Sequence, residues 1–199
     1  MTMKLRNHYY IMRHGEALSN VRNVVSCWPE TFNNSLTTKG KKDIKASVEN
    51  LKNKNVSLIF HSPLKRARMS AEIAGKVLKF KNLPAGRQVK PDKRLREVQF
   101  GIYNGRHLEG MWESFKNEEE RIHRGIEGGG ETYKEILDRM LDFLREVDET
   151  YSGRNVLIIS HEGPLFLLQG KTMGLTLKET IERFPPEVRP HKAEIRELN

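Results

Sequence analysis

Three short stretches of the sequence combine side chains that could bind and attack a phosphate group. They are Arg13-His14-Gly15-Glu16, His61-Ser62-Pro63-Leu64-Lys65-Arg66 and Ser160-His161-Glu162-Gly163-Pro164. Arginine binds phosphate oxygens through a planar fork and keeps its charge at every relevant pH. A neutral imidazole is nucleophilic at physiological pH. Two arginines and two histidines that converged on one point would therefore form a phosphate pocket with a nucleophile inside it.

Each stretch follows a short apolar run that predicts a buried strand, over residues 8–12, 56–60 and 156–159. Apolar residues recur at helical spacing in between, over 44–51, 64–78 and 132–147. Strands that alternate with amphipathic helices predict a three-layer α/β sandwich, with a mostly parallel central sheet and helices on both faces. Residues 191–198 could add an edge strand. Ligands bind beyond the carboxyl ends of parallel strands, so we expect the three stretches to meet in one crevice.

The sequence shows no internal repeat and no linker, and a length of 199 residues suits one domain. We therefore expect residues 1–199 to form a single domain with an irregular excursion over 102–130. The excursion could be a lid over the site or a small helical cap packed on the core. Its candidate lid residues are Trp112, Phe115, Arg121, His123 and Arg124.

The formal net charge of +9 fits a nucleic-acid binder, an enzyme with an anionic substrate, or a solvated lysine-rich surface. Aromatic residues are not interleaved with the basic runs, so no nucleic-acid partner is expected. No apolar run approaches the ~20 residues that span a bilayer, and no apolar signal region follows the first ten residues. The lone Cys27 cannot form an intrachain disulfide. We expect a soluble, cytoplasmic protein that has no membrane contact; its oligomeric state is not predicted.

The ordered set of motifs resembles the histidine phosphatase superfamily, also called phosphoglycerate mutase-like. The set is Arg13-His14-Gly15-Glu16 with Asn20, then Ser62-Pro63-Leu64-Lys65-Arg66-Ala67, then Glu97 ahead of Phe100-Gly101, then His161. Gly129-Gly130-Glu131 and the closing residues 193–198 extend it. The resemblance implies that His14 is the nucleophile, that Glu97 is the proton donor, and that three residues hold the phosphoryl group: Arg13, Arg66 and His161. It also implies substrate contacts from Asn20 and from the loop that contains Asn23 and Ser26.

Phosphoryl transfer needs an in-line nucleophile, positive donors and a proton for the leaving oxygen, which these residues supply. Gly15 would leave room for a close approach to His14. Glu97 would act first as an acid and then as a base; the alternative is a surface partner for Arg94 or Arg96. No metal or other cofactor is expected, because arginines and histidines supply the charge and the histidine spacings offer no compact ligand cluster.

The run Val98-Gln99-Phe100-Gly101-Ile102-Tyr103-Asn104-Gly105 is similar to the phosphatase branch, because mutases usually show Arg-His-Tyr-Gly after the acid. We therefore predict a metal-independent phosphomonoesterase that hydrolyses a small phosphorylated metabolite through phosphohistidine. The alternatives are a phosphoglycerate mutase, a catalytically weak phosphate-binding or interaction module, and a basic nucleic-acid binder. Glu162 stands where the family commonly has glycine. A carboxylate beside a phosphate pocket is repulsive, so this residue favours the catalytically weak module. We expect its carboxylate to face the start of a helix, away from phosphate.

Overall fold

The computed structural model describes residues 3–80 and 88–198, and it contains one five-stranded sheet. The strands are β1 (His8–Arg13), β2 (Val56–His61), β3 (Gln88–Pro91), β4 (Asn155–Ser160) and β5 (Ile195–Glu197). Their order is β3-β2-β4-β1-β5. The first four run parallel and β5 is antiparallel to β1. The predicted mostly parallel sheet is confirmed.

Helices follow the strands as the periodicity indicated. They are α1 (Leu18–Val21), α2 (Thr38–Glu49), α3 (Lys65–Val77), α4 (Tyr133–Thr150), α5 (Glu162–Thr172) and α6 (Leu177–Arg183). Short 3-10 turns are η1 (Lys52–Lys54), η3 (Lys93–Leu95), η4 (Gly101–Tyr103), η5 (Glu118–Ile122) and η6 (Pro186–Val188). The long α4 begins at a capping box, in which Thr132 and Glu135 each accept a backbone N–H of the other.

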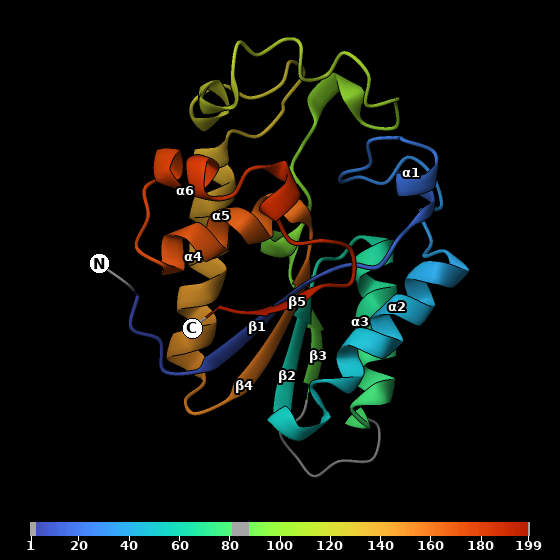
Figure 1. Cartoon of the computed structure of the whole chain (residues 1–199), viewed down its shortest axis with the longest axis vertical. Coiled ribbons are helices and arrows are strands. Elements are labelled where there is room, and N and C mark those ends of the chain that lie inside the picture. Colours follow the sequence, from blue (N-terminus) through green and yellow to red (C-terminus); the bar gives the residue numbers. More distant parts are fainter. Residues whose placement is uncertain (1–2, 81–87, 199) are drawn as a thin grey trace.

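Alternate residues of β1 pack into two different cores, because successive side chains of a strand point to opposite faces of the sheet. Tyr9 and Ile11 join the core formed with α4 and α5, whereas Tyr10 and Met12 join the core formed with α2 and α3. Figure 1 shows these two pairs of helices on opposite sides of the sheet. The predicted α/β sandwich with helices on both faces is confirmed.

The edges of the sheet differ most from the sequence expectation. β3 was not predicted, since it has only four residues and three of them are exposed. The predicted edge strand over 191–198 is present but is limited to the three residues of β5. The prediction of a single domain over 1–199 stays a prediction.

The excursion over 102–130 has its own small apolar cluster, formed by Val25, Met111, Phe115 and Ile126. It crosses the top of the molecule in Figure 1, beyond the carboxyl ends of β1, β2 and β4. Within residues 3–80 and 88–198, none of the helices has the length and apolar character needed to cross a membrane.

Candidate active site

The three histidine-containing stretches meet at the carboxyl end of the sheet, as predicted. Arg13 ends β1 and lies opposite Ser160, the last residue of β4. The amide of His14 donates to Ser160 O at 3.0 Å, and the amide of Ser62 donates to Ile159 O at 3.0 Å. The sheet hydrogen bonds thus continue beyond the strands and hold the starts of the three loops side by side.

His14 is buried, and both of its ring nitrogens are bonded. Nδ1 lies 2.8 Å from Gly15 O, and Arg66 Nε donates to Nε2 at 3.0 Å. A carbonyl only accepts and a guanidinium only donates, so the proton is on Nδ1 and the lone pair is on Nε2. Burial, followed by the charges of Arg66 and Arg13, holds the pKa of His14 well below its ordinary value. His14 is therefore a neutral imidazole with a nucleophilic Nε2.

Arg66, in the first turn of α3, is also buried and contacts both histidines of the site. Its Nη2 donates to Ser26 O at 2.9 Å and to His161 Nδ1 at 3.1 Å. Two carboxylates flank it, with Glu97 Oε2 at 3.5 Å from Nη2 and Glu30 Oε1 at 3.8 Å from Nη1. These contacts orient the buried guanidinium toward the nucleophile, where it can bind a phosphoryl group.

His161 is the N-cap residue of α5 and has no exposed surface. Because Arg66 donates to its Nδ1, the proton of the neutral ring is on Nε2, which donates to Ser62 Oγ at 2.8 Å. Burial, followed by the charge of Arg66, holds the pKa of His161 well below its ordinary value. The ring centroids of His161 and His14 are 5.0 Å apart, and of the two histidines only His14 lines the cavity.

Glu97 follows η3, and its side chain is 14% exposed. Oε1 accepts from the amide of Val98 at 3.0 Å, and Oε2 lies 3.4 Å from His161 Nδ1. Burial raises the pKa of Glu97 above its ordinary value. Arg94 and Arg96 pair with other carboxylates. The alternative of a surface ion pair for Glu97 is wrong, and the raised pKa suits a proton donor.

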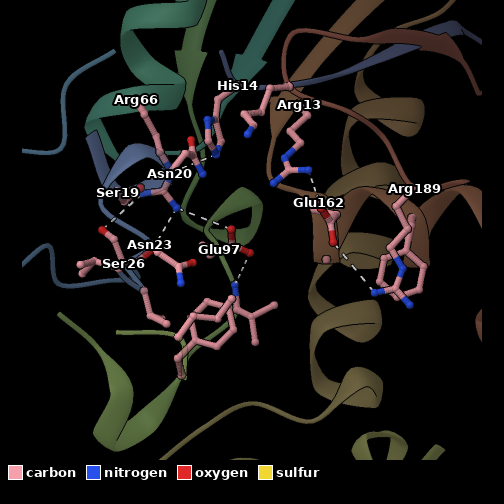
Figure 2. Close-up of a pocket in the computed structure, with 18 of the residues that line it drawn as sticks. Arg13, His14, Ser19, Asn20, Asn23, Ser26, Arg66, Glu97, Glu162 and Arg189 are labelled. Atoms are coloured by element: carbon pink, nitrogen blue, oxygen red, sulfur yellow. Dashed lines mark hydrogen bonds and ion pairs between the residues drawn. The ribbon is translucent and has the colours of Figure 1, made fainter. Parts of the chain in front are cut away.

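Glu162 does not face away from the phosphate pocket. Arg13 Nη1 donates to Glu162 Oε2, and Glu162 Oε1 lies 3.9 Å from Arg189 Nη1. Figure 2 shows the carboxylate between these two guanidinium groups. The expected orientation toward the helix start is therefore wrong, because two nearby full charges attract a carboxylate more strongly than the partial charge of a helix terminus.

The three predicted substrate contacts all line the cavity beside His14. Asn20 Oδ1 accepts from the amide of Ala17 at 2.9 Å and so caps α1. Asn23 has a positive φ of 53°, and its carbonyl accepts from the amide of Leu108 at 3.1 Å, which ties the loop to the excursion. Ser26 positions Arg66, as described above. Direct contact of these three residues with substrate stays a prediction.

The cavity has a volume of about 370 Å³ and extends from His14 toward the excursion. Of the five candidate lid residues, Trp112 and Arg121 line it. Phe115 belongs to the apolar cluster of the excursion, and His123 and Arg124 are not part of the wall. Part of the excursion thus lines the cavity and part packs on the small apolar cluster, and its role as a lid or a cap stays a prediction.

Sequence reasoning missed several residues of the wall. They are Tyr133, Phe166, Arg189 and Lys192. Tyr133 and Phe166 are hidden among the apolar residues of helices, and nothing local distinguishes Arg189 from a solvated arginine. Their position depends on how α4, α5 and the C-terminal segment pack together.

Two further residues hold the segment that carries Glu97. Glu131 Oε2 accepts from the amide of Gln99 at 3.0 Å, and Arg139 Nε donates to Glu131 Oε1 at 2.9 Å. Arg139 Nη2 also donates to Glu97 O at 3.3 Å. Glu131 lies in the Gly129-Gly130-Glu131 motif, so the sequence contained a signal for it, whereas Arg139 is one arginine of an amphipathic helix.

Gly15 is required by the packing of the protein itself. A Cβ atom at this position would lie 2.6 Å from Gly40 O, at the start of α2. A Cβ atom at Gly40 would lie 2.2 Å from Glu16 O. The two glycines therefore allow the loop after β1 to pack against the start of α2, and the room that Gly15 leaves for an approach to His14 stays a prediction.

His14, Glu97 and His161 could in principle hold a metal ion. Their ligand atoms all lie within 4.8 Å of one another, as the single such group in the described part of the chain. The expectation of no compact ligand cluster is wrong, because the sheet brings together residues that are distant in sequence. Arg66 donates to one nitrogen of each histidine and would repel a cation. The group therefore fits an anion better than a metal ion.

The buried histidines predict that acid destabilises the fold. Burial lowers the pKa of His14, His61 and His161 below the ordinary value of 6.5. The unfolded chain binds these protons and the folded chain does not, so the free energy of unfolding should fall as the pH drops from about 7.5 to about 5.5. The slope is at most about 1.4 kcal/mol per pH unit for each histidine. The raised pKa of Glu97 has the opposite effect on the free energy of unfolding, because the folded chain binds this proton more readily, but three histidines outweigh one carboxyl group.

Denaturant unfolding at several pH values measures this slope. The variant His61→Gln should make the slope shallower without a change in the pocket, because His61 does not line it. An unchanged slope in this variant, or a wild type whose stability does not fall below pH 7, would contradict the assignment of neutral buried histidines.

Comparisons with known proteins agree with the fold. The family model of the histidine phosphatase superfamily (branch 1) matches residues 9–192, so the chain belongs to this superfamily. Phosphoserine phosphatase 1 of Hydrogenobacter thermophilus is 28% identical over 174 residues, which is 85% of this chain and 77% of the relative. The probable phosphoglycerate mutase GpmB of Escherichia coli is 27% identical over 170 residues, with 83% and 74% covered. The resemblance stated from the motifs is confirmed.

A solved structure shows the same fold. The mycobacterial glucosyl-3-phosphoglycerate phosphatase, in complex with VO3, superposes with a TM-score of 0.78 over 94% of this chain and 90% of that chain, at 20% identity. The family and its relatives make this chain a phosphatase-type or mutase-type enzyme.

Proposed function

We propose that the protein is a phosphomonoesterase that hydrolyses a small phosphorylated metabolite through a phosphohistidine at His14, without a metal ion. One observation carries the proposal. The lone pair of His14 Nε2 is kept free of a proton by Gly15 O, and it lies among two phosphate-binding arginines and a carboxyl group of raised pKa. Figure 2 shows Arg13, Arg66 and Glu97 around His14.

In the first half of the reaction, the substrate phosphoryl group accepts the Nε–H of Arg66, which otherwise donates to His14 Nε2. The lone pair of Nε2 then forms the N–P bond as the ester P–O bond breaks. Glu97 gives its proton to the leaving oxygen and becomes a carboxylate. Arg13 and Arg66 stabilise the charge on the equatorial oxygens, as a divalent cation does in other phosphotransferases.

In the second half, a water molecule attacks phosphohistidine as the Glu97 carboxylate takes its proton. The new O–P bond replaces the N–P bond, inorganic phosphate leaves, and both His14 and Glu97 regain their starting states. Glu97 Oε2 lies 3.4 Å from His161 Nδ1 and 3.5 Å from Arg66 Nη2. This position supports both steps, since the leaving oxygen departs from the side of the phosphorus that the water later attacks, and Glu97 serves both.

The leaving-group side of the cavity supports a small and anionic substrate. A volume of about 370 Å³ is near the lower end for ligand pockets. The Arg121 guanidinium lies between the rings of Trp112 and Tyr133, 4.2 Å from each centroid. No carboxylate of the described residues lies within 4.0 Å of it, in contrast to Arg13, Arg66 and Arg189. Its positive charge is available to an anionic group on the alcohol part of the substrate.

A panel of phosphorylated metabolites, assayed for phosphate release with a chelator present, tests the proposal. We expect turnover that the chelator does not reduce, and about 10-fold preference for esters whose alcohol part carries a carboxylate over matched neutral esters. Arg121→Met should reduce this preference. Isomerised phosphoester in place of free phosphate would support the mutase alternative, and no release from any ester would support the weak phosphate-binding module.

We also propose that the reaction takes place in the cytoplasm and needs no nucleic-acid or membrane partner. The single cysteine supports this location, since Cys27 is a buried free thiol. Proteins of oxidising compartments typically use their cysteines in disulfides, whereas free thiols are typical of the reducing cytoplasm. Cell fractionation with an antibody against the protein measures the location directly.

A further inference from the structure

Glu162 remains unexplained by the proposed reaction, although it lies beside the phosphate pocket. It is the first residue of α5, directly after His161. Its carboxylate accepts from Arg13 Nη1 on one side and lies 3.9 Å from Arg189 Nη1 on the other. A carboxylate here removes positive charge from the pocket, so its presence requires a compensating role.

The hydrogen bonds of Arg13 indicate that role. Its Nη1 donates both to Glu162 and, at 3.1 Å, to Pro190 O. Its Nε is buried and has no hydrogen-bond partner among the described residues. A guanidinium can bind a phosphoryl group side-on through Nε–H and the neighbouring Nη2–H. Glu162 thus occupies the Nη1 end of Arg13, and a phosphoryl group that reached the buried Nε would supply its missing acceptor.

Glu162 is in turn held by a buried and rigid partner. Arg189 donates from Nη2 to both carboxylate oxygens of Glu118, at 2.6 and 2.7 Å, and from Nε to Phe184 O at 3.0 Å. Its guanidinium carbon lies 4.2 Å from the centroid of the Phe166 ring. Glu118 belongs to η5, within the excursion. Alternating charges therefore connect Arg13, through Glu162 and Arg189, to the excursion that borders the cavity.

We propose that Glu162 is a positioning residue, which fixes Arg13 so that its Nε edge meets the transferred phosphoryl group. The inference rests on the proposed function, because it takes Arg13 as a phosphate ligand. The opposite role is an internal anion that competes with phosphate for Arg13, and in that role removal of Glu162 would tighten phosphate binding. These ion pairs also connect the phosphate site to the excursion, since Arg189 bonds to Glu118 of η5.

A double-mutant cycle tests the inference. The wild type, Glu162→Ala, Arg13→Ala and the double variant are titrated with inorganic phosphate and with vanadate by calorimetry. Loss of a residue that orients a ligand-binding side chain typically costs 10–100-fold, so we expect Glu162→Ala to weaken binding about 10-fold. In the Arg13→Ala background the same substitution should have no further effect, because Glu162 acts through Arg13.

Three variants separate positioning from general destabilisation. Glu162→Gln keeps an acceptor oxygen and should retain most of the affinity, and it replaces the alanine variant in the cycle if that variant does not fold. Arg189→Gln should weaken binding in the same direction. Glu179→Ala removes the first-turn glutamate of α6, whose carboxylate accepts from the amide and hydroxyl of Thr176 at the helix start, and should leave binding unchanged.

Tighter phosphate binding by Glu162→Ala, or losses that simply add in the double variant, would overturn the inference and leave the proposed function intact. A wild type that binds neither phosphate nor vanadate would overturn both. Glu162→Ala and Glu162→Gln could also weaken phosphate binding equally, and do so in the Arg13→Ala background as well. That result would overturn the inference and assign Glu162 a structural role only.

Discussion

The variant His14→Ala should lose at least about 10⁴-fold in turnover and should keep its fold, since no nearby group can replace a covalent nucleophile. Nε2 of His14 has an unprotonated lone pair, to which Arg66 Nε donates until a phosphoryl group accepts that N–H. Steady-state phosphate release measures the loss. Rapid quench with labelled substrate should trap an acid-labile phosphoenzyme in the wild type and none in the variant.

His61 provides a matched control for this prediction. It is also a buried histidine, at the end of β2; its Nδ1 lies 2.8 Å from Ser62 O, and burial lowers its pKa. It does not line the cavity. His61→Ala should therefore cost a similar amount of stability and little turnover. If His14→Ala kept most of the wild-type rate at saturating substrate, covalent catalysis through His14 would be excluded.

The variant Glu97→Gln should slow phosphorylation of the enzyme by alkyl phosphates about 10²–10⁴-fold and barely affect an activated aryl phosphate. An alkoxide needs a proton in the transition state, whereas a nitrophenolate leaves unaided. The contrast must be measured in the pre-steady-state burst. Attack of water on phosphohistidine also uses Glu97, and that step slows both substrates at steady state.

Glu30 is the control for an effect through charge alone. Its Oε1 lies 3.8 Å from Arg66 Nη1, so Glu30 and Glu97 both flank the same guanidinium. Glu30→Gln should change the burst rates of alkyl and aryl phosphates by the same factor, because it perturbs Arg66 and transfers no proton. Equal loss for both substrates in Glu97→Gln would mean that Glu97 acts in this way too, and that another group donates the proton.

The elements that carry the site could be predicted from the sequence because their signals are local. Each strand beside the site contains four apolar residues, and α4 has an apolar stripe preceded by a capping box at Thr132. β3 had no such signal. It is short and exposed, and only its pairing with β2 defines it as a strand.

The sequence by itself determined which side chains reach the carboxyl end of the sheet, because a parallel strand delivers the residue that follows it to that end. The convergence of Arg13, His14, Arg66 and His161 was predicted on this ground, and Figure 2 and the contacts of Arg66 show it. Their chemical roles stay predictions that the variants above test.

Only the tertiary structure decided how the side chains are oriented and paired. Glu162 bonds to Arg13 across 149 positions of the chain, and Arg189 bonds to Glu118 across 71. Gly15 packs against Gly40, where the sequence suggested room for a ligand. Periodicity and motifs record what neighbouring residues favour, whereas ion pairs and close contacts between distant segments exist only once the two faces of the sheet are packed. The direction of a single carboxylate depends on those contacts.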